Sequence, residues 1–515
     1  MAELPELHYR ATLGACLQRA VTEYGDRDFI VMPERRSSFR DIEIGSRFLA
    51  KKMVAAGLGK GTRVGLFYTY GPEFCIAWLA ALRIGCLVEP FSTLYKPAEL
   101  RTALRIGDVQ ILIAPDRLLG RDVGAFLEQS VPNLRDQSAP NLVISELPYL
   151  RSIWITGETQ RPWATRVAAA PDRSAELISD EMLSALETEV SAADLAQITF
   201  TSGSSAQPKA VVHTHGSIVR NSSSPATAAT LRAVGIGIRL RRVFGGFPFF
   251  WIGGTLVLGQ ALQEGWTVCC LERFDAGAAL DLIENERVDW IMAWPSLIQA
   301  MRADPSFPSR DLRLPQLAAP APAAGGSGPT RHRGMSETMG AWFGVDCKIV
   351  DPATGATLPA GAEGELCVRG HAVMQGYYKV EREATFDADG WLHTGDSAVL
   401  SDSGPLFTGR YTEMIKHNGA NVSPREVEVA LESLPGVLHA IVFGLPHPEL
   451  GEQVTAVVVP EPGRNLSAGG LQEQARDQLS SFKVPTRIEF VADASDIPWL
   501  ATGKPDKLRL RTAFA

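Results

Sequence analysis

The sequence predicts a mixed α/β protein, with a large N-terminal domain of doubly wound sheets and a small α+β C-terminal domain. Its 515 residues exceed the length of one ordinary domain. Short apolar strands alternate with helical segments up to about residue 300, as in parallel sheets. Beyond that point the pattern of apolar and polar residues changes at two places along the chain. We therefore expect an N-terminal domain over 1–410, a β-rich subdomain over about 345–408 and a C-terminal domain over 411–515.

The N-terminal alternation begins with an amphipathic helix within residues 37–60, which glycines at 57 and 59 bring to an end. The strands and helices expected after it are, in chain order, RVGLFY (63–68), helical FCIAWLAALRIG (74–85), CLVEPF (86–91), a helix after Pro97, VQILIAP (109–115), WTVCCL (266–271), helical AGAALDLIENE (276–286) and VDWIMAW (288–294). This order is typical of a doubly wound sheet.

The remaining regions show other sequence patterns. Prolines cluster between Pro132 and Ser191, where we expect an irregular surface segment. Residues 345–396 alternate short strands with glycine turns, which indicates a β-rich subdomain. The elements expected in the C-terminal domain are helical EVEVALESL (426–434), the strands HAIVFGLP (439–446) and EQVTAVVVP (452–460), helical LQEQARDQL (471–479) and the strand RIEFV (487–491).

Composition narrows the class of partner. The formal charge of −8 and the pI near 5.7 disfavour nucleic acid or an anionic membrane as the main partner. The seven cysteines follow no metal-binding spacing and lie mostly in apolar runs, so we expect reduced, buried thiols and a cytoplasmic location. The N-terminus MAELPELHYR lacks the apolar core of a signal peptide.

The most apolar long stretch is GGFPFFWIGGTLVLGQAL, residues 245–262. It contains a proline and five glycines, which are unfavourable in a membrane-spanning helix of about 20 residues. We therefore interpret it as buried core and pocket wall, and expect no integral membrane segment.

A glycine- and serine-rich loop lies within FTSGSSAQPKAVVHTH, residues 200–215. Closely spaced backbone N–H groups with a nearby lysine suit a triphosphate. In the Walker pattern, Gly203 and Lys209 fall in register, but Pro208 replaces the second glycine and Ala210 the metal-binding hydroxyl. A Walker loop is therefore disfavoured, and a polar surface turn remains the alternative. The histidines at 213 and 215 are interpreted as residues of strand-end packing or polar contacts, not as metal ligands.

Four further segments accompany this loop in a fixed order: GMSETMG (334–340), GWLHTGD (390–396), GRYTEMIKHNGANVSPREVE (409–428) and ATGKPDK (501–507). With TSGSSAQPK (201–209), they resemble the signature motifs of the adenylate-forming superfamily. This superfamily includes acyl-CoA synthetases, adenylation domains and firefly luciferase. The resemblance covers essentially the whole chain. It implies that a carboxylate reacts with ATP to give an acyl-adenylate, after which a thiol displaces AMP.

The resemblance assigns ATP or AMP binding to several motif residues. These are Thr201, Ser202, Gly203, Ser204, Ser205, Lys209, Glu337, Thr338, Asp396, Arg410 and Lys504. Glu337 would bind Mg²⁺, a hard cation that prefers oxygen ligands, and Thr338 would donate its hydroxyl to a phosphate. Asp396 and Arg410 would contact the ribose, or form a structural ion pair between hairpins.

Lys504 is the main catalytic candidate, with Glu337 and Thr338 beside it. Its ammonium would bridge the substrate carboxylate and the α-phosphate as charge develops. The resemblance also implies that the C-terminal domain rotates between the two steps about a hinge at Thr412, a position where the family usually has Asp or Lys. In the second orientation, the coenzyme A thiol would approach past Lys416, Asn418 and Gly419.

The acyl pocket is expected from two aromatic segments, FPFFWIGG (247–254) and AWPS (293–296). The residues assigned to it are Phe249, Phe250, Trp251, Gly253 and Trp294. Their apolar character favours a large hydrophobic or fatty acid, although a buried aromatic cluster is also what an ordinary core contains.

Three departures from the family pattern stand out. Ala206 and Ala210 occupy loop positions that are usually glycine. The interval 313–347 is shorter than the family pattern, and Arg333 replaces the aromatic residue that normally precedes GMSETMG. We favour the interpretation that residues are absent from this interval; a truncated adenine pocket is the alternative.

The resulting expectation is an ATP-dependent acyl-CoA ligase with Mg²⁺ as cofactor and ATP, coenzyme A and a hydrophobic carboxylic acid as substrates. Two alternatives stay open. One is a stand-alone acyl-AMP ligase that loads the phosphopantetheine of a carrier protein, and the other is a non-catalytic sensor of acyl-adenylate. Self-association into a homodimer is also left open.

Overall fold

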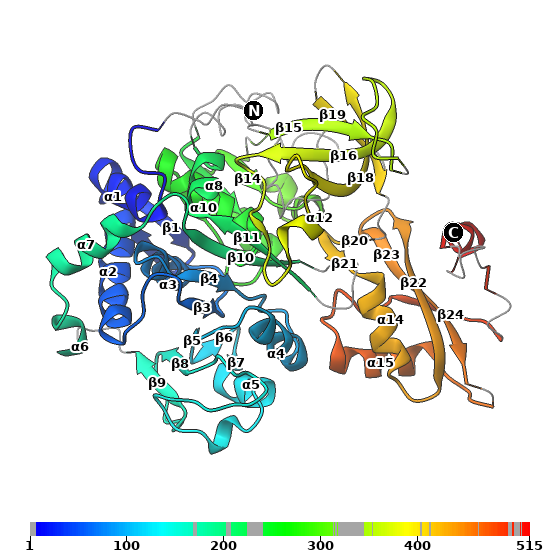
Figure 1. Cartoon of the computed structure of the whole chain (residues 1–515), viewed down its shortest axis with the longest axis horizontal. Helices are drawn as coiled ribbons and strands as arrows, with labels where there is room; N and C mark the ends of the chain where they lie inside the picture. Colours follow the sequence, from blue (N-terminus) through cyan, green and yellow to red (C-terminus); the bar gives the residue numbers. More distant parts are fainter. Residues whose placement is uncertain are drawn as a thin grey trace.

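The computed structural model describes residues 7–167, 173–201, 208–223, 240–312, 314, 317, 345–352, 354–401, 404–410, 414–461, 463–492, 497–498, 505 and 507–514. Within these ranges the chain forms two parts (Figure 1). The larger contains three sheets of four or more strands and one two-stranded hairpin, all built from strands up to Arg410, and the smaller contains one sheet built from strands after residue 414. The mixed α/β class predicted from the sequence is confirmed.

The largest sheet has eight strands and is parallel through most of its width. In spatial order its strands are β17 (Gly376–Tyr377), β11 (Lys209–Thr214), β10 (Leu195–Thr201), β4 (Leu87–Pro90), β3 (Arg63–Leu66), β5 (Ile111–Pro115), β8 (Ser152–Thr156) and β9 (Ala164–Val167). The strand β11 runs antiparallel to both β10 and β17. Because of this reversal, the glycine- and serine-rich loop, which joins β10 to β11, begins and ends at the same end of these two neighbouring strands.

A second sheet of five strands lies beside the first. Its order is β14 (Trp290–Met292), β12 (Arg242–Gly245), β13 (Thr267–Cys269), β1 (Asp28–Met32) and β2 (Arg35–Ser38). The strands from β14 to β1 pair in parallel and β2 closes the edge antiparallel.

Helices of the larger part pack between and around these sheets (Figure 1). They are α1 (Leu13–Tyr24), α2 (Phe39–Ala55), α3 (Pro72–Arg83), α4 (Pro97–Ile106), α5 (Val123–Ser130), α6 (Arg173–Glu176), α7 (Asp180–Glu189), α8 (His215–Asn221), α10 (Ile252–Glu264), α11 (Ala276–Asn285) and α12 (Pro295–Ala303). Short 3₁₀ turns occur at Leu134–Asp136, Phe307–Ser309 and Arg382–Ala384, and a small hairpin at β6 (Arg117–Leu118) and β7 (Arg121–Asp122).

One hydrophobic core joins both sheets. Val64 and Val88 from the eight-stranded sheet and Ile30 and Val268 from the five-stranded sheet belong to the same buried cluster, together with helices α1, α2, α3 and α10. Inside it, the Trp78 indole N–H donates to Gln197 Oε1 at 2.9 Å. A polar bridge therefore ties α3 to β10 in the middle of apolar packing.

The apolar stretch at residues 245–262 contributes α10 to this core. The helix spans 13 residues, and nine of them are buried. No helix of the described ranges is long and apolar enough to span a bilayer. The interpretation of this stretch as buried core is consistent with these observations.

The segment from Pro132 to Ser191 differs from the expected irregular surface chain. Strands β8 and β9 continue the eight-stranded sheet, and the inner residues of β8 are buried. The expectation was wrong because SIWIT (152–156) is a short apolar run whose period the neighbouring prolines hide.

The β-rich region forms a four-stranded antiparallel sheet of β15 (Val345–Val350), β16 (Glu363–Gly370), β18 (Leu392–Ser401) and β19 (Gly404–Arg410). The chain between β16 and β18 reaches over to the eight-stranded sheet as β17, where Val212 pairs with Gly376. This pairing attaches the β-rich sheet to the loop-bearing edge.

The smaller part places α14 (Pro424–Glu432) and α15 (Ala468–Gln478) against one sheet. That sheet has the order β21 (Ala420–Val422), β20 (Ile415–His417), β23 (Gly451–Pro460) and β22 (Val437–His447), with β24 (Arg487–Phe490) parallel to β23. Helix α16 (Lys507–Phe514) packs on the opposite face, where Leu510 joins the buried side chains of β22 and β23.

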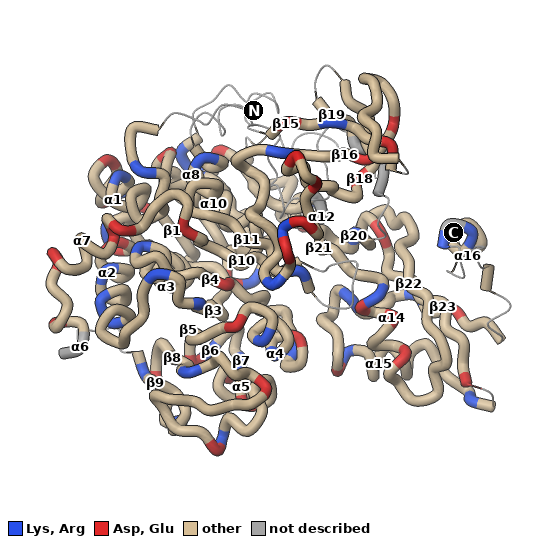
Figure 2. The backbone as a smooth tube through the Cα atoms, viewed as in Figure 1, with Lys and Arg blue, Asp and Glu red and all other residues tan. Residues whose placement is uncertain are grey.

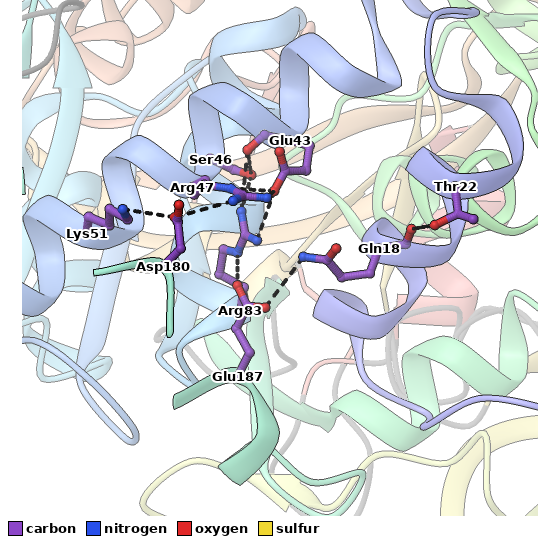
Figure 3. Close-up of polar contacts among 9 residues, drawn as sticks. All are labelled: Gln18, Thr22, Glu43, Ser46, Arg47, Lys51, Arg83, Asp180 and Glu187. Atoms are coloured by element: carbon purple, nitrogen blue, oxygen red, sulfur yellow. Dashed lines mark hydrogen bonds and ion pairs between the residues drawn. The ribbon is translucent and has the colours of Figure 1, made fainter. Parts of the chain in front are cut away.

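Positively and negatively charged residues are interspersed along both parts of the chain (Figure 2). A buried charge cluster links α2, α3 and α7 (Figure 3). The Arg83 side chain is 2% exposed, and its Nε donates to Glu187 Oε1 at 2.5 Å. Its other nitrogens donate to Ser46 and Glu43. Because α7 precedes β10, the cluster fixes the approach of the chain to the glycine- and serine-rich loop.

Replacing Arg83 by alanine should lower the free energy of unfolding by about 3–5 kcal/mol, because the carboxylates of Glu43 and Glu187 would lose a buried counter-charge. The Arg47 side chain, which contacts Glu43 but is 40% exposed, provides the matched control. Arg47→Ala should cost about 1 kcal/mol or less. Urea unfolding followed by tryptophan fluorescence measures both, and equal losses would contradict the assignment of a buried anchor.

Candidate functional site

The site lies at the junction of the two parts, around a cavity of about 410 Å³. Its lining residues come from α4, β10, α10 and Trp294 of the larger part and from the β20–β21 hairpin, α14 and α15 of the smaller part. Each wall has a separate chemical character: a loop end, an aromatic surface, a hairpin tip and a charged cluster.

The glycine- and serine-rich loop begins and ends beside this cavity. Thr201 and Lys209 are paired across the β10–β11 hairpin, and Thr201 and Pro208 both line the cavity. The Lys209 ammonium lies 4.7 Å from the centroid of the Tyr377 ring in β17, a cation–π contact. The predicted loop residues Ser202, Gly203, Ser204 and Ser205 lie outside the described residues.

The histidines after the loop are packing residues. His215 is buried, and its Nδ1 accepts a hydrogen bond from the Leu13 backbone N–H at 3.3 Å. Burial lowers the pKa of His215 to about 4, so its imidazole is neutral at physiological pH. His213 is also buried, in β11.

Asp396 lies in β18 opposite Arg410 of β19. Its side chain belongs to a residue with no exposed surface, and its backbone N–H donates to Thr394 Oγ1 at 3.1 Å. The register brings the two predicted ribose-binding residues to the same rung of the sheet. The Arg410 side chain, and the predicted site residues Glu337, Thr338, Thr412 and Lys504, lie outside what the structure describes.

A cluster of three potential metal ligands supports this strand. Among the described residues, donor atoms of Glu365, Cys367 and His393 lie within 4.8 Å of one another. His393 Nδ1 is 2.9 Å from Glu365 Oε2, and Glu365 Oε1 accepts from the Gly395 N–H at 3.0 Å. These contacts hold the GWLHTGD strand against β16, so we assign the cluster a structural role.

The β20–β21 hairpin carries the predicted thiol-side residues. Its turn is Asn418–Gly419, with φ of 49° and 81°, and two central residues of positive φ are typical of a type I′ turn. The Lys416 N–H donates to Glu452 Oε2 at 2.6 Å, which anchors the hairpin to β23. The tip rests on Trp294, because a Cβ on Gly419 would lie 2.6 Å from Trp294 Cδ2.

Aromatic side chains form the opposite wall. Phe247 and Trp294 meet edge to face with ring centroids 5.0 Å apart, and Trp251 lies 6.3 Å from Trp294. The cavity lining includes Phe247, Trp251, Ile252, Gly253 and Trp294. Phe247 and Ile252 lie in the predicted pocket segment FPFFWIGG but were not among the residues assigned individually to the pocket.

Phe249 and Phe250 are placed differently from Trp251. Both are buried, and Phe249 packs against Tyr70 at 5.1 Å and Phe74 at 5.6 Å in the core. The structure therefore brings Trp251, Gly253 and Trp294 to the cavity and directs Phe249 into the packing behind it.

The fourth wall is a charged cluster that sequence patterns did not reveal. Lys483 Nζ lies 2.7 Å from Glu99 Oε1 of α4 and 2.7 Å from Glu426 Oε1 of α14. Burial opposes the charge of Lys483, but attraction to Glu426 and Glu99 outweighs this effect and raises its pKa. Glu99 and Lys483 are 384 positions apart, so no local motif could pair them.

Comparisons with known proteins place the chain among adenylate-forming enzymes. Residues 17–329 and 323–378 match the family described as AMP-binding enzyme, and residues 426–504 match the AMP-binding enzyme C-terminal domain. The first match is broken inside the shortened interval 313–347. That interval lies almost wholly outside the described residues.

Two curated relatives span nearly the whole chain. A long-chain-fatty-acid–CoA ligase of Bacillus subtilis (strain 168) is 27% identical, covering 97% of this chain and 94% of its own. The mitochondrial medium-chain acyl-CoA ligase ACSF2 of Danio rerio is 26% identical, covering 97% and 88%. Among solved structures, the amide bond synthetase McbA from Marinactinospora thermotolerans superposes with a TM-score of 0.73 at 25% identity, covering 97% of this chain and 99% of McbA.

Gly419→Ala should separate the hairpin tip from Trp294, because the added methyl group meets the indole and alanine resists positive φ. Hydrogen–deuterium exchange of residues 415–422 should rise in this variant. Gly463→Ala is the matched control, with φ of 77° and no atom within 4 Å of the added Cβ. If residues 415–422 exchange no faster in Gly419→Ala than in Gly463→Ala, the contact with Trp294 does not hold the hairpin.

Proposed function

The chain belongs to the AMP-binding enzyme family and is an AMP-forming acid–thiol ligase, and from this premise we propose that it is an ATP-dependent acyl-CoA ligase for hydrophobic carboxylic acids. The observation that carries the proposal is that the ends of the glycine- and serine-rich loop, an aromatic wall and the β20–β21 hairpin line one and the same cavity. Such a cavity lets an acid, a nucleotide and a thiol meet at one point.

In the first half-reaction, an oxygen of the substrate carboxylate attacks the α-phosphorus of ATP, and the bond from that phosphorus to the leaving pyrophosphate breaks. Two anions approach each other in this step, so positive charge and oriented donors must offset their repulsion. We assign the β- and γ-phosphates to the loop Thr201–Lys209 and the ribose hydroxyls to Asp396 and Arg410. Lys504 would bridge the carboxylate and the α-phosphate.

Mg²⁺ belongs to this proposal, with Glu337 as its ligand and Thr338 as a hydroxyl donor to a phosphate beside it. When bound, the ion would neutralise phosphate charge. The buried carboxylate of Asp396 suits a different role, because a carboxylate can accept hydrogen bonds from both hydroxyls of a ribose.

In the second half-reaction, the thiol sulfur of coenzyme A attacks the acyl carbon, the bond from that carbon to the AMP oxygen breaks, and the thiol proton is released. We assign the approach of the thiol to the β20–β21 hairpin, where Lys416 and Gly419 line the cavity and Asn418 lies in the turn between them. Their hairpin faces Trp294, so the thiol would arrive opposite the aromatic wall that holds the acid.

The hydrophobic acid is proposed from the aromatic wall. The rings of Phe247, Trp251 and Trp294 meet edge to face, an arrangement that presents apolar surface to the cavity. The two curated relatives act, by their names, on long-chain and medium-chain acids, which supports an aliphatic substrate.

A panel of straight-chain acids of increasing length, with aromatic acids and amino acids alongside, tests the substrate class. We expect ATP-dependent pyrophosphate release to peak among aliphatic acids and AMP release to depend on coenzyme A. Release that needs a carrier protein's phosphopantetheine instead would favour the acyl-AMP ligase alternative. ATP binding without pyrophosphate release from any acid would favour the sensor.

Lys504→Ala should slow adenylate formation by about 10²–10³-fold, because it removes a charge directed at the transition state. Thioester formation from pre-made acyl-adenylate should be within about twofold of wild type, since Lys504 acts in the first step. Lys507→Ala is the comparison variant, because Lys507 pairs with Glu428 within the smaller part. Unchanged adenylation in Lys504→Ala would make the assignment wrong.

A further inference from the structure

Glu99 joins the two parts of the chain beside the cavity. Its carboxylate accepts from Lys483 Nζ at 2.7 Å through one oxygen, and from the Ser480 hydroxyl through the other. The side chains of Glu99 and Lys483 are only 10% and 8% exposed. Solvent therefore screens this ion pair much less than one on the surface.

Glu99 is held in place before the smaller part docks. It is the third residue of α4, and its carboxylate also accepts from the backbone N–H of Lys96, the N-cap residue of this helix, at 2.8 Å. This contact lies wholly within the larger part. The carboxylate therefore needs little ordering to receive Lys483 and Ser480.

The partners of Glu99 remain satisfied if the two parts separate. Lys483 stays paired with Glu426, because both residues belong to the smaller part. Glu99 keeps its capping contact and becomes solvated. Separation thus leaves no buried charge unpaired, and this condition allows the contact to form and break repeatedly.

The Glu99–Lys483 ion pair and the contact of the hairpin tip with Trp294 are present in the same structure. Glu99, Lys483 and Glu426 line the same cavity as Trp294, Gly419 and Lys416. The smaller part is thus held at two points across the cavity, by the ion pair and by the hairpin tip. Both points belong to the orientation in which the proposed thiol-side hairpin faces the acyl wall.

We propose that Glu99 is a positioning residue for the thiol-transfer step, acting through Lys483 and Ser480 to hold the smaller part in the orientation that presents the β20–β21 hairpin to Trp294. This inference rests on the proposed two-step function for its kinetic consequence. Its structural consequence, the preference for this orientation, is independent of any reaction.

Glu99→Gln tests the proposal, because glutamine keeps the size and the capping oxygen but removes the charge. We expect thioester formation from pre-made acyl-adenylate to slow by about tenfold, the order expected for losing a charge-assisted hydrogen bond. Adenylate formation, measured by ATP–pyrophosphate exchange, should be unchanged or faster. Glu99→Asp, which keeps the charge, should restore part of the thiol step.

Glu73→Gln is the matched control, since Glu73 pairs with Arg35 at the surface of the larger part and both side chains are nearly half exposed. It should leave both steps within about twofold of wild type, as expected for a surface pair. Equal slowing of both steps by Glu99→Gln, or no slowing of the thiol step, would overturn the proposal.

Hydrogen–deuterium exchange without substrates provides the structural readout. Residues 415–422 should exchange faster in Glu99→Gln than in wild type or Glu73→Gln, because the second attachment of the smaller part is lost. Unchanged exchange would overturn the positioning role. If wild type catalyses neither half-reaction, the proposed function fails, while this exchange measurement still decides whether Glu99 holds the orientation.

Discussion

Lys483 places a positive charge at the junction of the two parts, where its side chain is 8% exposed, and that charge requires carboxylates around it. Glu426 supplies one from the same part and Glu99 supplies the other from across the junction. The cavity depends on this arrangement, because its opposite walls come from the larger and the smaller part, and each part has its own packed core. The proposed two-step function needs a junction that can open, and a polar contact meets this need better than a purely apolar one.

The larger part is organised to keep the loop-bearing hairpin still. Gln197 in β10 accepts from Trp78 of α3 and donates to Thr255 of α10 at 2.8 Å, in the middle of the core. Arg83 ties α7, which leads into β10, to α2. Both connections are buried, so the strand that precedes the loop is held on each side by satisfied polar groups.

Sequence patterns were sufficient to predict structural features that depend mainly on residues close together in the chain. The apolar runs RVGLFY, VQILIAP and WTVCCL predicted β3, β5 and β13, because buried parallel strands are apolar throughout. Aromatic residues in FPFFWIGG predicted a wall, but the sequence could not tell Trp251, which reaches the cavity, from Phe249, which packs behind it. The side chains of neighbouring residues point in different directions, and tertiary packing decides which of them faces the cavity.

Other features could not be read from the chain. SIWIT in β8 was hidden among prolines, although its neighbours in the sheet make it a regular parallel strand. Glu99 lies in the first turn of a helix, and Lys483 lies in the segment that leads to β24. Charged residues are common in both positions, so neither local pattern marks a functional residue. Only the docking of two cores brings them together, and no periodicity within either segment records that docking.

The strand β17 has a consequence for the fate of the intermediate. It attaches the β-rich sheet, which carries Asp396, to β11, which carries Lys209, and Lys379 beside it reaches Asp108 at 2.6 Å. The residues that we propose for the phosphates and for the ribose thus belong to one body. In the proposed reaction, a mixed anhydride that water would hydrolyse would stay on this surface between its formation and its use, while the smaller part changes orientation.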